Sequence, residues 1–369
     1  MPRTTAYRTI VLAALSLGSA CVPFRGHAPA PEATAPVGDT ATRLLLRPVP
    51  VTPAYRAAVQ RGTRTATGAP GPNYWQQRVR YRIDAELDPQ STLLHGRERI
   101  VYRNNSPVAL RDVVLNLYQN IFTENVPRNR YAPNTGGITL ERVAVDGTAL
   151  TQQPVSAISV LTNPRGNAPM GYSVQGTLGR LILPRMLIPG DSTVLEIDWH
   201  FKVPPYVGAA ASFRTGWEDA LGGRVLQVAQ WYPQVAVYDD VYGWDATPYL
   251  GEGEFYLEYG DFDVALTLPA GWLVGATGTL RNPEQVLTPE ARQRLAGATA
   301  PDAPVHVVTE ADLAGGRATQ PGSGGRLTWR FQASDVRDFA FATSDRYLWD
   351  ATRAQVPTDD GAGTRSVTI

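Results

Sequence analysis

A chain of 369 residues is long enough for one large domain or two ordinary ones, and it can bury a full core without disulfide bonds. Its 34 lysines and arginines balance 34 aspartates and glutamates, so no net positive field is present to hold nucleic acid, and we expect no nucleic-acid partner. One cysteine excludes an intramolecular disulfide and a cysteine zinc ribbon, and four histidines limit histidine metal chemistry.

Residues 1–21 have the pattern of an export signal. A positive start is followed by an apolar run, 10–17, that is too short to cross a membrane as a helix. The signal ends at Cys21, the only cysteine, and the sequence after it is polar and rich in proline. Two interpretations stay open: a bacterial lipoprotein signal in which Cys21 carries a lipid anchor, or an ordinary cleavable signal. Both predict an exported protein, and the first predicts a lipoprotein of the periplasm or outer membrane.

Residues 22–72 are rich in proline, alanine, threonine and glycine, which predicts a semi-stiff, disordered linker. Within this segment, 54–61 has an amphipathic pattern that ends at Gly62 and is consistent with one or two helical turns. The rest of the chain, 73–369, is assigned to one large domain.

From Tyr74 onward, apolar and polar side chains alternate with the period of a half-buried strand. The pattern predicts strands over 79–87, 97–103, 113–117, 139–145, 180–183, 194–201, 262–268 and 327–331. Asp146-Gly147 is a strong two-residue hairpin turn. Helical signals are sparse, and the clearest runs from the capping residue Thr288 to Gly297. The predicted fold class is therefore all-β: a large antiparallel sandwich with few short helices.

Common catalytic motifs are missing from the sequence. A zinc-hydrolase helix carries two histidines one turn apart, and no histidine here has another within four residues. The nearest approach to a Gly-x-Ser-x-Gly elbow, 321–325, begins with proline and is interpreted as a loop. A Ser-His-Asp site built from distant segments stays open. We interpret His95, His200 and His306 as structural or surface histidines.

Two clusters of residues stand out. The acidic set has the chemistry of a calcium site or a carboxylate pair, although solvated strand faces and turn caps account for it more simply. Its members are Asp239, Asp240, Glu252, Glu254, Glu258, Asp261 and Asp263. The aromatic set suits a binding wall or an interface, while each member alone is equally typical of a sandwich core. Its members are Trp231, Tyr232, Tyr238, Tyr242, Trp244, Tyr249, Phe255, Tyr256 and Tyr259.

Several pieces of sequence resemble, in order and spacing over 74–350, the N-terminal domain of one family of zinc aminopeptidases (gluzincins). They are Tyr74-Trp75-Gln76, Tyr81-Arg82-Ile83, Gly96-Arg97-Glu98, Leu115-Asn116-Leu117-Tyr118, Ala229-Gln230-Trp231-Tyr232-Pro233, Gly260-Asp261-Phe262-Asp263-Val264, Leu268-Pro269, Ala276-Thr277-Gly278 and Val336-Arg337-Asp338-Phe339-Ala340-Phe341-Ala342. The family includes the membrane alanyl aminopeptidases and leukotriene hydrolase, and the chain is most similar to its exported bacterial branch. The resemblance implies a saddle-like all-β domain that packs on a thermolysin-like catalytic domain and lines the cleft for the peptide's amino end.

The resemblance also implies two substrate-binding residues. In the family, a glutamine or glutamate in the segment that matches 229–233 contacts the substrate amine. Gln230 matches the first glutamine of that pattern, and Tyr232 stands two residues on, where the family often has an acid or an amide. This departure bears on how a free amine is recognised.

The family's His-Glu-x-x-His and Gly-x-Met-Glu-Asn motifs have no counterpart, because none of Met1, Met170 and Met186 precedes Glu-Asn. We expect no metal site in this chain and zinc in the full-length protein. The strand-like end, 364–369, has no polar tail or cap, and it predicts a fragment or truncated reading frame.

Three functions are compatible with these observations. In the first, the chain is the non-catalytic substrate-cleft domain of an exported zinc-dependent metallopeptidase, and peptides are its partners through the catalytic domain. The second is a stand-alone surface lipoprotein that binds peptides or partner proteins through its aromatic segment. The third is an unrelated sandwich hydrolase.

Overall fold

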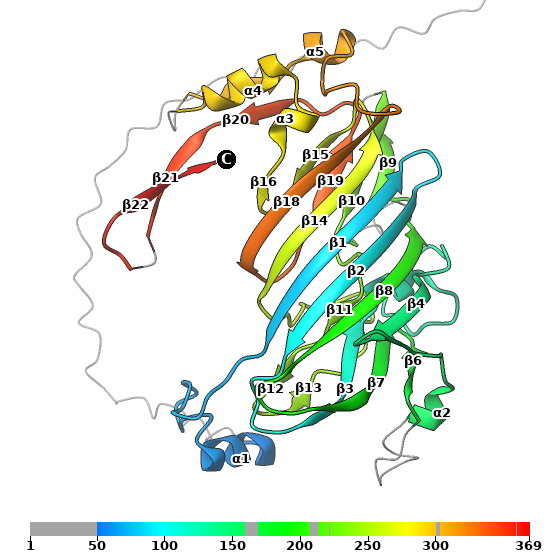
Figure 1. The fold of residues 1–369 in the computed structure, drawn as a ribbon, viewed down its shortest axis with the longest axis vertical. Coiled ribbons are helices and arrows are strands. Elements are labelled where there is room, and N and C mark those ends of the chain that lie inside the picture. Colours follow the sequence, from blue (N-terminus) through cyan, green and yellow to red (C-terminus); the bar gives the residue numbers. More distant parts are fainter. Residues whose placement is uncertain (1–49, 159–168, 207–212, 221, 300–302, 359) are drawn as a thin grey trace, which may run out of the picture. The chain divides into compact units, whose positions relative to one another are not determined.

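A twisted sheet of eight strands organises the fold (Figure 1), in the spatial order β16-β18-β14-β1-β2-β8-β4-β5. Its strands are β1 (Arg78–Asp88), β2 (Leu93–Arg103), β4 (Thr139–Val145), β5 (Thr148–Ala149), β8 (Ser192–Lys202), β14 (Gly260–Pro269), β16 (Thr279–Leu280) and β18 (Arg326–Val336). The computed structural model describes residues 50–158, 169–206, 213–220, 222–299, 303–358 and 360–369. The predicted signal, Cys21 and most of the linker lie outside these residues.

Two four-stranded sheets accompany the large one, in the orders β15-β19-β10-β9 and β11-β3-β7-β6. Their strands are β3 (Leu110–Asn116), β6 (Gly171–Gln175), β7 (Leu178–Leu187), β9 (Gly216–Ala220), β10 (Gly223–Val228), β11 (Gln234–Val235), β15 (Leu273–Ala276) and β19 (Phe341–Ser344). Short strand pairs are β12 (Tyr238–Asp239) with β13 (Gly243–Trp244), β17 (Val305–Val308) with β20 (Trp349–Ala351), and β21 (Arg353–Pro357) with β22 (Thr364–Thr368). Apolar side chains of the three larger sheets share one core, which confirms the all-β class.

Strand β1 shows why the large sheet forms. Its residues alternate between exposed and buried along the whole strand, and the buried ones are Val79, Tyr81, Ile83, Ala85 and Leu87. On one side β1 pairs antiparallel with β2. On the other it pairs parallel with β14, a pairing that the predicted antiparallel sandwich does not contain.

Several local signals act as the sequence predicts. The turn Asp146-Gly147 joins β4 to β5 with φ values of 48° and 79°, as a two-residue hairpin requires. Thr288 caps the N-terminus of helix α4 (Pro289–Ala296), and its side chain accepts a hydrogen bond from the Ala291 N–H. The remaining helices are α1 (Pro53–Arg61), α2 (Val155–Ile158), α3 (Pro283–Val286), α5 (Glu310–Ala314) and the 3₁₀ helix η1 (Tyr118–Phe122). Among the described residues, no helix has the length and apolar character that a membrane crossing demands.

The boundary between linker and domain differs from the sequence-based one at 72/73. The compact unit that contains the strands begins at Val51, so 51–72 belong to it. Helix α1 accounts for the difference: Thr52 caps its first turn, and Gly62 ends it with a left-handed φ of 75°. The ends of a short helix are rich in proline and glycine, as a linker is, so the sequence alone does not distinguish a short capped helix from a linker.

Glu98 lies on the core side of β2 and is only 1% exposed. Among the described residues, neither of its carboxyl oxygens has a hydrogen-bond partner. Burial raises the pKa of Glu98 well above its usual range, because an unpaired charge is costly in an apolar core. Burial therefore favours the protonated form of this carboxyl in the folded chain.

We predict that Glu98→Gln stabilises the domain at pH 8 by about 1–3 kcal/mol, because an amide has no proton to release. The unfolded glutamate ionises above a pKa of about 4.3 while the folded one keeps its proton to higher pH, so the wild type loses stability as pH rises above that value. Urea unfolding at pH 5 and pH 8 measures the difference, which should be larger at pH 8. Glu218→Gln, at an exposed position of β9, is the control. Equal pH dependence in wild type and Glu98→Gln would contradict the prediction.

Candidate functional site

Gln230 lies in the connection between β10 and β11, with a left-handed φ of 48°. Residues other than glycine rarely adopt this conformation, and it is kept where surrounding contacts enforce it. The carbonyl of Gln230 accepts a hydrogen bond from Gln119 Nε2 at 2.9 Å. Its own Nε2 donates to Asp338 Oδ2 at 3.4 Å. Contacts at both the backbone and the side chain thus hold this half-buried residue in place.

Tyr232 is a core residue, with 2% of its surface exposed. Its ring packs edge-on against Tyr81 and Phe262, with centroids 5.4 Å and 5.8 Å away. Its hydroxyl donates to Asp338 Oδ1 at 2.8 Å and accepts from Gln234 Nε2 at 3.3 Å. The structure therefore links Tyr232 to Gln230 through Asp338, and the role visible for Tyr232 is to position that carboxyl.

Asp338 is the shared partner of this group. Its Oδ1 also accepts a hydrogen bond from the Phe339 N–H at 2.8 Å. Burial raises the pKa of Asp338 above its usual range, although the hydrogen bonds from Tyr232, Phe339 and Gln230 oppose the rise. A half-buried carboxyl with several donors is a rigid anchor for the Gln230 turn.

Segments that are far apart in the sequence converge at this turn. Trp231 Nε1 donates to the Phe339 carbonyl at 2.8 Å across 108 positions of the chain. The Val235 N–H donates to the Tyr81 hydroxyl at 3.0 Å, and Gln234 pairs with Asn116 between β11 and β3. These contacts connect residues 231–235, which include and directly follow one piece that carries the aminopeptidase resemblance, to three other such pieces, around 81, 116 and 339.

The aromatic set divides between core and surface. Trp231 and Tyr232 are buried, whereas Tyr242, Tyr256 and Tyr259 are 69%, 48% and 40% exposed. The other members are half-buried: Tyr238 and Trp244 pack on each other, and Tyr249 and Phe255 pack around Tyr118. The core interpretation is therefore confirmed for Trp231 and Tyr232, and the binding-wall interpretation stays a prediction for the exposed members.

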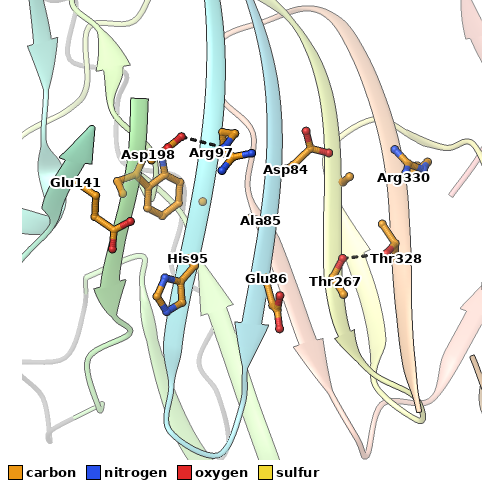
Figure 2. Close-up of a pocket in the computed structure, with 13 residues that line it drawn as sticks. Asp84, Ala85, Glu86, His95, Arg97, Glu141, Asp198, Thr267, Thr328 and Arg330 are labelled. Carbon is orange, nitrogen blue, oxygen red and sulfur yellow. Dashed lines mark hydrogen bonds and ion pairs between the residues drawn. The ribbon is translucent and has the colours of Figure 1, made fainter. Parts of the chain in front are cut away.

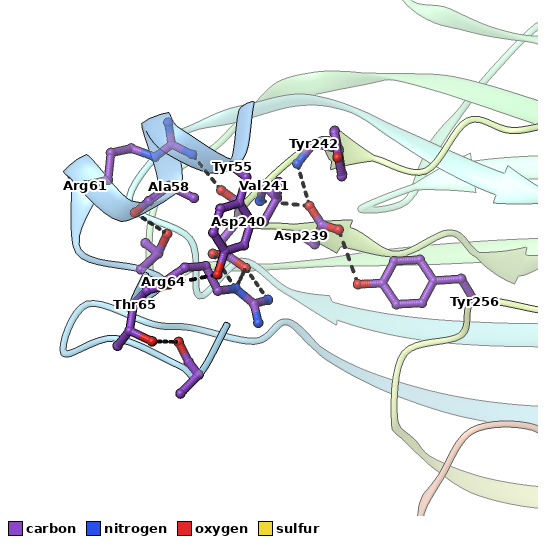
Figure 3. Close-up of polar contacts among 12 residues, drawn as sticks. Tyr55, Ala58, Arg61, Arg64, Thr65, Asp239, Asp240, Val241, Tyr242 and Tyr256 are labelled. Atoms are coloured by element: carbon purple, nitrogen blue, oxygen red, sulfur yellow. Dashed lines mark hydrogen bonds and ion pairs between the residues drawn. The ribbon is translucent and has the colours of Figure 1, made fainter. Parts of the chain in front are cut away.

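Asp239 and Asp240 of the acidic set serve a turn and an ion pair. Asp239 Oδ1 accepts hydrogen bonds from the backbone N–H groups of Val241 and Tyr242, and its Oδ2 accepts from the Tyr256 hydroxyl at 3.2 Å (Figure 3). The Asp240 carboxylate accepts hydrogen bonds from Arg64 Nε, at 2.9 Å and 3.1 Å to its two oxygens, and from Arg64 Nη2 at 2.6 Å. Within the described part of the chain, no three of these carboxylates form a group that could hold a metal ion.

Asp240 also fastens helix α1 to the strands. Its side chain is only 1% exposed, and its carbonyl accepts a hydrogen bond from Arg61 Nη2 at 2.6 Å. Burial alone would raise the pKa of Asp240, but the hydrogen bonds from Arg64 and Thr63 outweigh it and hold the pKa below its usual range. The ionised form is therefore the one that stabilises this contact.

We predict that Asp240→Asn lowers the free energy of unfolding at pH 7 by about 1–3 kcal/mol, because Arg64 loses its charged partner. The wild type loses this contribution on acidification, since the unfolded aspartate takes up a proton near pH 3.9, before the folded one does. Urea unfolding at pH 7 and pH 3 should show a gap between wild type and variant that narrows at pH 3.

Asp84→Asn is the matched control, because Asp84 and Arg82 form an exposed pair at 3.9 Å and such pairs contribute little. A gap for Asp240→Asn that stays constant with pH would show that the ionised carboxylate is not the stabilising form.

The outer face of the eight-stranded sheet carries a shallow hollow of about 520 Å³ (Figure 2). Charged and hydroxyl side chains line most of it: Arg97 Nε contacts Asp198 Oδ1 at 3.0 Å, and the hydroxyls of Thr267 and Thr328 are 2.8 Å apart. Small-molecule sites are usually deep and mostly apolar, so this hollow does not resemble one.

The structure places the three described histidines differently. His306 is exposed and its Nδ1 contacts Asp350 Oδ1 at 2.6 Å, as a surface histidine does. His95 and His200 instead lie together with Glu141. The sequence analysis missed this group, and only the register between strands joins its members.

No model of a known protein family matches the sequence, and no curated protein matches it either. Among solved structures, the chain is similar to the M1 zinc metallopeptidase from Deinococcus radiodurans, with a TM-score of 0.40 and 13% identity, over 81% of this chain and 48% of that one. A mutant of that enzyme bound to a Tyr-Ser-Ala substrate gives a TM-score of 0.40 and 13% identity over 81% and 49% of the two chains. A two-domain M1 zinc metallopeptidase mutant bound to L-tryptophan gives 0.39 and 12% over 81% and 49%. The chain spans about half the length of these structures.

Proposed function

We propose that this chain is the N-terminal, non-catalytic β domain of an exported, zinc-dependent aminopeptidase-like metallopeptidase, and that it forms part of the cleft for the peptide's amino end. The observation that carries the proposal is the convergence at Gln230. Pieces of sequence that carry the family resemblance, around 81, 116 and 338, contact residues 230–235 of the Gln230 turn and the strand that follows it.

The chemistry of Gln230 suits the proposed task. An amide oxygen accepts hydrogen bonds from an ammonium group, and an amide held by fixed contacts loses little side-chain entropy when it binds. The left-handed backbone of Gln230 and its links to Gln119 and Asp338 supply such fixed contacts.

Peptide hydrolysis by this family's mechanism needs a metal ion to polarise the carbonyl and to activate water. The family's His-Glu-x-x-His motif, which would hold that zinc, is not in these 369 residues. The proposal therefore gives binding and orientation of the peptide to this chain, and hydrolysis to the full-length protein. Export, and lipid attachment at Cys21, belong to the proposal as predictions from the signal.

The gene beyond the codon for Ile369 tests the assignment. We expect an in-frame His-Glu-x-x-His downstream, and zinc-dependent release of amino-terminal residues by the longer product. A stop codon directly after Ile369 would instead support the alternative of a stand-alone lipoprotein module, for which the exposed Tyr242, Tyr256 and Tyr259 offer a contact surface. Metal-independent hydrolysis by the present chain would overturn both.

We predict that Gln230→Ala in the full-length protein lowers kcat/KM for peptides about tenfold or more while changing the melting temperature little. Gln230→Asn is the companion variant, because asparagine tolerates a left-handed backbone but its side chain is shorter. Gln227→Ala, at an exposed position of β10, is the control. Parallel losses of melting temperature and turnover in both Gln230 variants would identify Gln230 as a structural residue.

A further inference from the structure

Three residues from three adjacent strands meet on the outer face of the large sheet. His95 of β2 lies directly opposite His200 of β8, with ring centroids 5.4 Å apart. His200 Nδ1 lies 2.6 Å from Oε1 of Glu141, which belongs to β4. One potential ligand atom from each residue lies within 4.8 Å of the other two.

The strand geometry explains how the sheet brings these residues together. Side chains alternate between the faces of a strand, so His95 and His200 point outward while their neighbours Leu94, Trp199 and Phe201 are buried. The register of β4 against β8 shifts between Leu140 and Arg142, which leaves Glu141 as the extra residue of a bulge. Bulges commonly re-aim a side chain, and this one brings the Glu141 carboxylate to His200.

We propose that His95, Glu141 and His200 form a binding site for a divalent cation of the zinc type. Two imidazoles and one carboxylate are a ligand set that zinc accepts in proteins, with a fourth position left for water. Ligand atoms around one tetrahedral zinc ion lie roughly 3.3 Å apart, given metal–ligand distances of about 2.0–2.2 Å. The three potential ligand atoms lie within 4.8 Å of one another, and binding would require the 2.6 Å contact between His200 Nδ1 and Glu141 Oε1 to open while His95 moves closer.

Access and position favour such a site. The side chains of His200 and Glu141 are 32% and 47% exposed, so an ion can reach them from solvent. Glu141 and His95 face the open hollow, where the labelled side chains in Figure 2 include further carboxylates. All three ligands stand on strands of one paired sheet, so their spacing is set by backbone hydrogen bonds and not by a loop.

A simple His–carboxylate contact does not account for the group. His306 and Asp350 make the same 2.6 Å contact on β17 and β20, and among the described residues they belong to no group of three potential ligands. On β2 and β8, by contrast, the imidazole of His95 lies beside the contact between His200 and Glu141 and supplies a third potential ligand. The inference rests on these three residues alone and is independent of the proposed peptidase function.

Isothermal titration of the full chain with Zn²⁺, after chelator treatment and with a tag free of histidine, tests the site. We expect one ion per chain, and a loss of affinity of about tenfold or more in each of His95→Ala, His200→Ala and Glu141→Gln. His306→Ala and His27→Ala are the matched controls and should bind as the wild type does. The melting temperature of the wild type should rise with Zn²⁺, because an ion that binds only the folded chain stabilises it.

Several results would overturn the proposal: no binding at micromolar free Zn²⁺, binding that survives both histidine variants, or binding that depends on His27 or His306. An unchanged affinity in Glu141→Gln would overturn the three-ligand site. Circular dichroism of each variant checks that the fold is retained, and the Co²⁺ absorption spectrum of the wild type should report a four-coordinate ion.

Discussion

The alternation of side chains along the central strands is the constraint on which the structure depends. Along β1 every second residue is buried, and the neighbouring strands β2 and β14 repeat the pattern. Because the strands are hydrogen-bonded in fixed register, one face of the sheet is a continuous apolar layer. The other face carries arginines, carboxylates and histidines. Glu98 places a carboxyl group on the buried face, and its pKa is raised because of that burial.

The same register builds the Gln230 turn. The parallel pairing of β1 with β14 places Tyr81 beside Phe262, and their rings stack at 4.7 Å. Tyr232 packs edge-on against both rings, so the hydroxyl that holds Asp338 is fixed by the sheet. A substrate contact at Gln230 would thus depend on a pairing between strands that are almost half the chain apart.

Local features of the fold were predictable, and non-local ones were not. The alternation over 79–87, the turn at Asp146-Gly147 and the cap at Thr288 each depend on a few neighbouring residues, and all three were predicted. The parallel pair and the Arg64–Asp240 contact join residues that no short-range pattern relates; the latter are 176 positions apart. The aromatic set was recognised from composition, but composition does not tell which ring faces the core.

The candidate site also has one part that the sequence revealed and another that depends on contacts between distant residues. Gln230 was identified through a resemblance, while its left-handed backbone and its link to Asp338 appear only in the structure. The group of His95, Glu141 and His200 needs the register of three strands and a bulge at Glu141. A histidine spacing rule for helices cannot detect ligands that a sheet brings together.

The parallel pairing also bears on how the chain folds during synthesis. Strand β2 can pair with β1 soon after both are synthesised, because only a short turn separates them. The opposite edge of β1 stays unpaired until Gly260 and its neighbours have been synthesised. Contacts of such long range slow folding, and an open strand edge invites pairing with other chains. The exposed Arg80, Arg82 and Asp84 put charges along that edge and disfavour such pairing until β14 arrives.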